Sequence, residues 1–153
     1  MTGVQTCALP ISDITRAVQG LGRIGLDAIA GHLQWGVTEW KSQGLPVGRV
    51  PQISVHDLAT MKEERPDLVV VDVRELFEWD EGHIAGALHL PMGEALARRD
   101  VVPGGRPKAV LCAGGLRSST VISALSRAGL TDFYNVIGGM TAWQKGGYST
   151  VKR

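Results

Sequence analysis

One stretch of the chain places a cysteine, two glycines and an arginine at a spacing that suits nucleophilic chemistry. Residues 112–118 read Cys-Ala-Gly-Gly-Leu-Arg-Ser, and Cys112 closes the segment 108–112, which is apolar after Lys108 and predicts a buried strand. Where such a strand leads through a glycine-rich turn into a helix, backbone N–H groups and the positive helix end point at the sulfur. These surroundings lower the pKa of a thiol, so Cys112 is predicted to be a thiolate nucleophile at neutral pH.

The neighbours of Cys112 support that interpretation. Gly114 and Gly115 permit positive φ angles and a close approach of the backbone to a ligand. Arg117 adds a fixed positive charge and can hold an anionic group through two parallel hydrogen bonds. A lone cysteine at a strand end is more often an ordinary core residue. The complete Cys-x4-Arg-Ser loop between strand and helix favours the reactive thiol instead.

Strand and helix signals alternate along the part of the chain that contains this loop. A capping box of Ser54 and Asp57 predicts a helix that runs to about Glu64. A second helix is expected over 75–81, a third from Arg117, and a fourth after Gly138-Gly139; short strands are expected at 53–54, 68–72, 87–89, 108–112 and 133–136. This order predicts an α/β fold, a parallel sheet with helices on both faces. In such sheets ligands bind at the carboxyl ends of the strands, which is where Cys112 falls.

Composition excludes several classes of function. The 153 residues include 16 Lys and Arg against 15 Asp and Glu, a net charge of +1, so no basic excess is available to bind nucleic acid. Apolar runs such as 68–71 are far shorter than the roughly 18 residues that a membrane span needs. No Cys and His cluster has zinc-ligand spacing, so no metal is expected. A reactive thiol fits a reducing compartment, which favours the cytoplasm.

Four motifs, in their order and spacing, resemble the rhodanese family of sulfurtransferases over residues 50–153. They are Asp72-Val73-Arg74, Gly82-His83-Ile84-Ala85-Gly86-Ala87, Cys112-x4-Arg117-Ser118 and Gly138-Gly139-x3-Trp143. The resemblance implies a rhodanese-like fold and a Cys112 that accepts a sulfane sulfur from a small anionic donor, either thiosulfate or a low-molecular-weight persulfide. The Cys112 persulfide then passes the sulfur to cyanide or a thiol. No cofactor is implied.

The loop residues receive roles from this chemistry. The backbone amides of Ala113, Gly114, Gly115, Leu116, Arg117 and Ser118 are expected to cradle the persulfide anion. Arg117 is expected either to bind the anionic donor or to brace the loop. No general base is needed, because a thiolate already supplies the attacking species. The residues between Cys112 and Arg117 are small and apolar, which leaves the donor preference open.

Two other functions compete with this one. Cysteine phosphatases and related arsenate reductases resemble the architecture but use Cys-x5-Arg, a loop one residue longer that surrounds a tetrahedral oxyanion. The four residues between Cys112 and Arg117 favour sulfur over phosphate. The second alternative is a non-catalytic rhodanese module for sulfur sensing or protein interaction. The intact Cys112 and Arg117 favour the enzyme.

The remaining polar and aromatic residues are interpreted as structural. Asp72 and Arg74 are expected to form an internal ion pair, and His83 to hydrogen-bond within a turn; these three residues would support the fold around the site. Trp143 is expected to pack in the core. The acidic residues of 75–81 are interpreted as a solvated helix face: Glu75, Glu78, Asp80 and Glu81. No role is assigned to His32, His56 or His89.

The first third of the chain has a different character. Residues 1–11, MTGVQTCALPI, resemble the translation of a sequencing adapter and are predicted to be an artefact, so Cys7 receives no role. Residues 21–46 repeat the pattern of Leu, Arg, Gly and Trp found in 125–149. Residues 12–49 are therefore predicted to be the C-terminal stub of a preceding rhodanese-like module plus a linker, and 50–153 a complete domain. This layout resembles tandem rhodaneses and fusions of rhodaneses to a metallo-β-lactamase fold.

Overall fold

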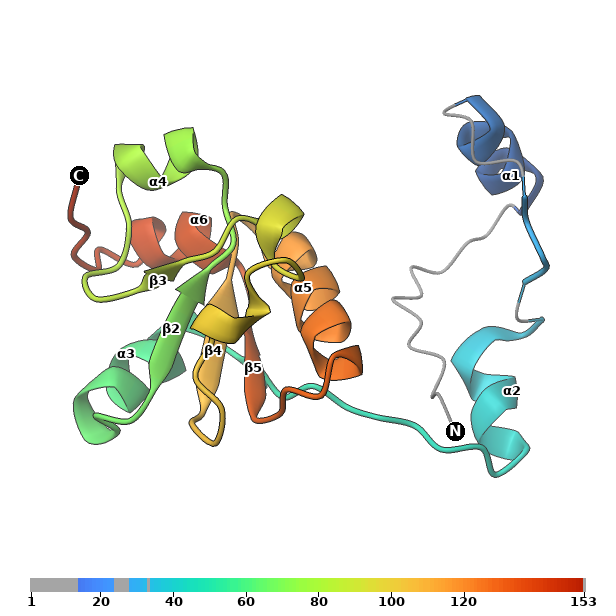
Figure 1. Ribbon diagram of the computed structural model, residues 1–153, viewed down its shortest axis with the longest axis horizontal. Helices are drawn as coiled ribbons and strands as arrows, with labels where there is room; N and C mark the ends of the chain where they lie inside the picture. The colour runs from blue at the N-terminus through green and yellow to red at the C-terminus, as the bar shows by residue number, and fades with distance from the viewer. Residues whose placement is uncertain (1–13, 24–27, 33, 153) are drawn as a thin grey trace. The chain divides into compact units, whose positions relative to one another are not determined.

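The computed structural model describes residues 14–23, 28–32 and 34–152 (Figure 1). The chain divides into two compact units, Met1–Gly48 and Arg49–Arg153. Segment 1–11, including Cys7, lies outside the described residues. Among those that are described, no helix is long and apolar enough to span a membrane.

The second unit is built on a sheet in which every strand pairing is parallel. The strands follow the order β1-β5-β4-β2-β3. Their bounds are β1 Gln52–Ile53, β2 Val69–Asp72, β3 Leu88–His89, β4 Lys108–Leu111 and β5 Phe133–Val136. The two central strands, β4 and β2, consist of apolar and β-branched residues apart from their outermost positions, as a strand covered on both faces requires.

Helices cover both faces of this sheet (Figure 1). They are α3 Val55–Glu64, α4 Leu76–Glu81, α5 Leu116–Arg127 and α6 Gly139–Lys145, with short 3-10 turns η1 Met92–Glu94 and η2 Arg99–Val101. Since neighbouring residues of a strand point to opposite faces, β4 contributes Val110 to a core beneath α5 and Ala109 to a core beneath α3 and α6. The expected α/β architecture is confirmed.

Local signals account for where the helices begin. Ser54 accepts a hydrogen bond from the Asp57 amide at 3.1 Å, and the Ser54 amide donates to Asp57 Oδ2 at 2.8 Å, so the expected capping box is present. Helix α5 begins at Leu116, one residue earlier than predicted. The reason is Gly115, whose φ of 105° turns the chain out of the loop and makes it the N-cap.

The first unit contains two helices among its described residues, α1 Ile14–Arg23 and α2 Gly36–Ser42. Helix α2 has seven residues, as does α6, and both begin at the glycine that the sequence repeat pairs. Gly36 and Gly139 also share a positive φ, 62° and 49°. The similarity of the two segments therefore extends from the residues to the backbone.

Candidate active site

Cys112 lies between the last residue of β4 and the first turn of α5, at the carboxyl edge of the sheet. The residue is 1% exposed, so the loop covers its sulfur. The Gly115 amide donates a hydrogen bond to Sγ at 3.0 Å, and the hydroxyl of Ser118 lies 3.6 Å from the same atom. The loop of residues 112–118 thus closes around the thiol predicted to be the nucleophile.

Two opposing effects set the pKa of Cys112. Burial raises the pKa, because an ion is poorly solvated inside the protein. Hydrogen bonds from the Ser118 amide and hydroxyl, and from the amides of Gly115 and Gly114, lower it and prevail. The pKa of Cys112 therefore lies below its ordinary value. Three of the six amides expected in the cradle act on the sulfur in this way.

Helix α6 braces the loop from the other side. The amides of Met140 and Thr141 donate to the carbonyl oxygens of Cys112 and Ala113 at 2.8 and 3.1 Å. Gly139 makes this approach possible: a Cβ there would overlap the Cys112 carbonyl oxygen and lie 2.8 Å from that of Ala113. Gly139, the second glycine of the fourth motif, therefore lets the backbone of α6 touch the backbone of the loop.

Arg117 makes a two-pronged ion pair with Glu78 of α4. Nη1 lies 2.6 Å from Oε2 and Nη2 lies 2.7 Å from Oε1. Hydrogen bonds from Arg117 outweigh burial and lower the pKa of Glu78, while Glu78 raises the pKa of Arg117. The interpretation of Glu78 as part of a solvated helix face is wrong, because strand β2 lies beside β4 and brings α4 to the loop. Glu75, Asp80 and Glu81 are exposed as expected.

A chain of polar side chains behind the loop, buried at Ser118 and Asn135 and exposed at Gln52, is absent from the sequence-based expectations. Ser118 Oγ donates to Asn135 Oδ1 at 2.6 Å, and Asn135 Nδ2 donates to Gln52 Oε1 at 2.7 Å and to the Gly115 carbonyl at 3.3 Å. Asn135 is in β5 and Gln52 in β1, so the chain ties two neighbouring strands to the loop. The signal for it was a single polar residue, Asn135, inside a strand that is otherwise apolar or aromatic.

The residues expected to support the site form a second network. Arg74 donates to both oxygens of Asp72, with Nη2 at 2.7 Å from Oδ2, and both residues are buried. The same guanidinium donates to the carbonyls of Glu78 and Gly82 at 2.9 Å, which fixes the middle and the C-terminal end of α4. The internal ion pair predicted for Asp72 and Arg74 is present in the structure.

His83 lies in the turn expected for it. Its Nδ1 is 3.1 Å from the carbonyl oxygen of Trp79, and its ring stacks on the Trp79 indole with 3.6 Å between centroids. His89 stacks on the same indole at 4.6 Å, and its Nε2 lies 2.9 Å from the Arg74 carbonyl. Both histidines therefore contact the structural framework of α4 rather than Cys112. Trp143 is in the core, as expected.

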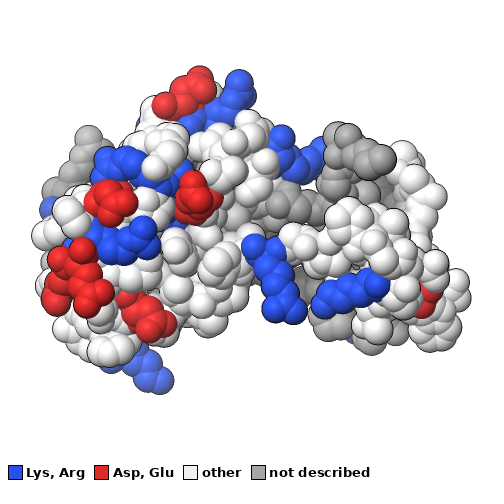
Figure 2. Space-filling model, turned by 90° about the horizontal axis from the view of Figure 1, so that it is seen from below, with Lys and Arg blue, Asp and Glu red and all other residues white. Residues whose placement is uncertain are grey.

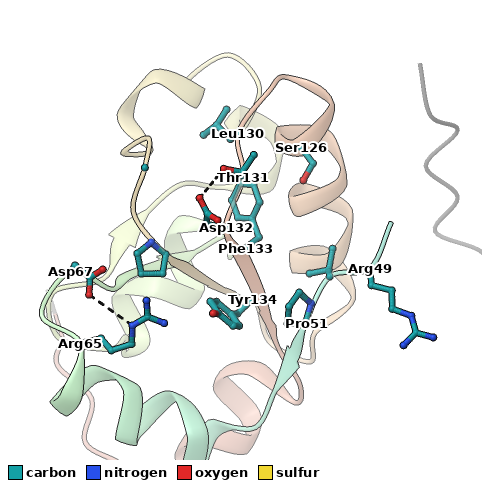
Figure 3. A pocket seen from close by; sticks show the side chains of 13 residues that line it. Arg49, Pro51, Arg65, Asp67, Ser126, Leu130, Thr131, Asp132, Phe133 and Tyr134 are labelled. Atoms are coloured by element: carbon teal, nitrogen blue, oxygen red, sulfur yellow. Dashed lines mark hydrogen bonds and ion pairs between the residues drawn. The ribbon is translucent and has the colours of Figure 1, made fainter. Parts of the chain in front are cut away.

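A cavity of about 700 Å³ lies away from this loop, at the amino ends of the strands (Figure 3). It is lined by residues that precede or begin strands, among them Arg49, Pro51, Pro107, Asp132, Phe133 and Tyr134. None of residues 112–118 lines it. Because ligands of open parallel sheets bind at the carboxyl ends of strands, the Cys112 loop is the better candidate for chemistry.

The distribution of charged side chains and of possible metal ligands bears on which reactions the Cys112 loop could support. On the face seen in Figure 2, basic and acidic side chains are interspersed rather than gathered by sign. Within the described part of the chain, no group of three or more His, Cys, Asp or Glu residues is placed to hold a metal ion. The loop around Cys112 thus offers a thiolate, backbone amides and one neutralised arginine.

Comparison with known proteins defines the class to which this fold and site belong. The rhodanese-like domain family matches residues 54–146, so the chain belongs to the rhodanese-like family. The crystal structure of a rhodanese-related protein from Thermoplasma volcanium superposes with a TM-score of 0.61 at 32% identity. That match covers 67% of this chain and 99% of the other. The predicted rhodanese-like fold is confirmed.

Two curated relatives are similar over the same region. The thiosulfate sulfurtransferase GlpE of Coxiella burnetii is 33% identical over 81 residues, which are 53% of this chain and 76% of GlpE. The protein YrkF of Bacillus subtilis is 29% identical over 94 residues, 61% of this chain. The matched region spans 51% of YrkF, about half its length. Sulfur transfer is thus an activity named among the relatives.

Proposed function

We propose that the protein is a sulfurtransferase that moves a sulfane sulfur through a persulfide on Cys112. The observation that carries this proposal is the environment of Sγ: hydrogen bonds from Gly115 and Ser118 hold the pKa of Cys112 below its ordinary value despite burial. The thiolate is the form that attacks sulfur. Membership of the rhodanese-like family supports the same chemistry.

The reaction consists of two displacements at sulfur. In the first, the Cys112 thiolate attacks the sulfane sulfur of a donor; an Sγ–S bond forms, and the donor S–S bond breaks with its electron pair leaving on sulfite or a thiolate. In the second, cyanide or a thiolate attacks the outer sulfur and releases the Cys112 thiolate. Neither step requires a metal or a redox cofactor, because each S–S bond lost is replaced by another bond to the same sulfur.

The loop has a separate part in each displacement. The amides that lower the pKa of Cys112 surround Sγ, and we expect them also to stabilise the negative charge of the outer persulfide sulfur. Arg117 braces the loop through Glu78, the second of the two roles expected from the sequence. Asp72, Arg74 and His83 support α4, which carries Glu78.

The test is the intact mass of the protein after treatment with thiosulfate or glutathione persulfide. Wild type should gain about 32 Da, one sulfur atom, and lose it again to cyanide, whereas Cys112→Ser should gain nothing. The sequence has a second cysteine, Cys7, outside the described residues, so the difference between wild type and Cys112→Ser assigns the added mass to Cys112. If folded wild type gained no sulfur from either donor, the proposal would fail and a non-catalytic module would be favoured.

We further propose that residues 12–49 derive from the end of a second rhodanese-like module. The shared frame of 21–46 and 125–149 supports this, as does the equal length of α2 and α6. The paired glycines, Gly36 and Gly139, also share a positive φ, as expected of two copies of one segment. The test is the structure of a protein that contains residues 12–153 after a longer N-terminal region: if that region lacked a second copy of the sheet, this origin would be refuted.

A further inference from the structure

The cation of the candidate site is already neutralised within the protein. Both terminal nitrogens of Arg117 are bound to the two oxygens of Glu78, at 2.6 and 2.7 Å. Arg117 holds the pKa of Glu78 low, so the carboxylate is charged at neutral pH and the pair carries no net charge. A donor anion could form two parallel hydrogen bonds with this guanidinium only by displacing the Glu78 carboxylate.

The second arginine near this edge of the sheet, Arg74, is bound by partners within the protein. Arg74 is buried, binds both oxygens of Asp72, and also donates to the carbonyls of Glu78 and Gly82. Arg74 is therefore closed to a dianion, and the charge of Arg117 is already balanced by Glu78. Attraction of a negative donor would rest on the loop amides alone, and these already face the negative sulfur of Cys112.

Exposed apolar side chains occur on the segments that meet at this edge of the sheet. Leu116, within the loop itself, is 57% exposed, and Phe77, next to Glu78, is 68% exposed. Ile137 is 55% exposed and is close to the loop, because its Cα is 3.7 Å from where a Cβ of Gly115 would lie. These three residues come from the segments that follow three neighbouring strands, β4, β2 and β5, whose carboxyl ends meet at this edge.

We propose that Glu78 sets the donor preference of the site: by neutralising Arg117 beside an apolar surround, it favours an organic hydropersulfide with an uncharged carbon group over the thiosulfate dianion. The inference rests on the proposed function, since it concerns the donor of the same Cys112 persulfide. A dianion next to a thiolate needs a free cation to offset the repulsion. A hydropersulfide is attacked in its protonated form, R–S–SH, which carries no charge on its sulfurs, and its carbon group can cover apolar surface.

The favoured transfer balances without any further reactant. The Cys112 thiolate attacks the terminal sulfur of R–S–SH, and an Sγ–S bond forms as the donor S–S bond breaks. The electron pair leaves on RS, which takes up the proton of the former S–H group, so the products are the Cys112 persulfide anion and the thiol R–SH. One negative charge is present before and after the step, whereas thiosulfate would add two more charges and release the sulfite dianion.

Glu78→Gln tests the proposal because it removes the negative charge that pairs with the Arg117 guanidinium and keeps Arg117 itself in place. The measurement is the second-order rate constant for sulfur loading of Cys112, followed by intact mass, with thiosulfate and with benzyl hydropersulfide as the two probes. The ratio of the thiosulfate to the hydropersulfide rate constant should rise at least about tenfold in Glu78→Gln. Thiosulfate loading of this variant should also fall with added NaCl, because the new attraction is electrostatic.

Two further variants keep the result interpretable. Glu81→Gln removes the same charge from an exposed position of the same helix, and its ratio should stay within about twofold of wild type. In the double variant Glu78→Gln, Arg117→Gln the gain with thiosulfate should disappear, since no cation remains to be freed. A cooperative thermal unfolding transition, measured for each variant, serves as the check that the variant is folded.

An unchanged ratio in folded Glu78→Gln would overturn the proposal, as would an equal rise in Glu81→Gln or a rise that persists in the double variant. These outcomes differ from failure of the proposed function. In that case wild type would load no sulfur on Cys112 from either probe, and no ratio could be formed. A wild type that loads from benzyl hydropersulfide, combined with an unchanged ratio in Glu78→Gln, would keep the enzyme and remove the role of Glu78.

Discussion

The reactivity of Cys112 is decided by a few donors that the folded chain brings to one atom. Burial by itself would keep the thiol protonated, and the amides of Ser118, Gly115 and Gly114 reverse that effect. The Ser118 hydroxyl has a single proton, and Asn135 Oδ1 is 2.6 Å away whereas Sγ is 3.6 Å away. The hydroxyl therefore contributes less to the sulfur than the backbone does.

Ser118→Ala should raise the pKa of Cys112, because it removes the hydroxyl and leaves the amide of residue 118 in place. Less thiolate is then present at pH 6, and alkylation of Cys112 by iodoacetamide should slow by roughly threefold there. Above about pH 10 both proteins hold the thiolate, so their rates should converge. The measurement is the alkylation rate of Cys112 between pH 5 and pH 10.

Thr120→Ala is the matched control for this experiment. Thr120 lies on the same helix, is exposed, and donates its hydroxyl to the Leu116 carbonyl rather than to sulfur. Its rate profile should follow that of wild type. A Ser118→Ala profile identical to wild type at every pH would show that the hydroxyl has no effect on the sulfur.

Local sequence identified the residues of the loop but not the residues that reach it from elsewhere. Cys112, Gly115 and Arg117 stand within six residues of one another, so their spacing alone indicated a shared site. Glu78 is 39 positions from Arg117, and Asn135 is 17 from Ser118. They meet because β2 and β5 lie on either side of β4, and a single sequence does not reveal which strands are neighbours.

At the scale of elements, the site depends on the loop being held between α5 and α6. Gly139→Ala should break this arrangement, because the added Cβ overlaps the Cys112 carbonyl oxygen and the φ of 49° is unfavourable for alanine. Left-handed strain and overpacking together should lower the free energy of unfolding by about 3 kcal/mol. Urea unfolding measures the loss, and sulfur loading of Cys112 should fall with it.

Gly147→Ala separates the two causes. Gly147 also has a positive φ, 76°, but no atom lies within 4 Å of where its Cβ would be. Only the backbone strain applies, so the loss should be about 1 kcal/mol, with normal loading of Cys112. Equal losses in the two variants would mean that the contact between α6 and the loop contributes nothing.

Element types were predicted better than element ends, and for identifiable reasons. The capping box at Ser54 and the apolar run before Asp72 are strong local signals, and the structure has α3 and β2 there. The outer strands β1 and β3 have only two residues each, and their extent is decided by pairing with β5 and β2. Helix α4 was foreseen, but its capping box uses Glu75 and Glu78, a pair the sequence did not single out.

At the scale of the whole molecule, the candidate chemistry belongs to one of the two units. Every residue named in the site lies within Arg49–Arg153, and so do both hydrophobic cores. The described helix α1 of the other unit has no buried residue, and its apolar positions Ile14, Val18 and Leu21 are about 40% exposed. Exposed apolar side chains spaced along one helix face promote association between molecules.

Deleting residues 1–48 should therefore leave a folded, active protein that is more soluble. The thermal midpoint should change by less than about 4 °C, which corresponds to roughly 1 kcal/mol for a domain of this size. Sulfur loading of Cys112 should match the full chain, and soluble yield should rise. In the full chain, Val18→Gln with Leu21→Gln should reproduce the gain in yield, because it removes the apolar face and keeps the length. A larger fall in the midpoint on deletion would show instead that residues 1–48 stabilise the rhodanese-like unit through contacts of their own.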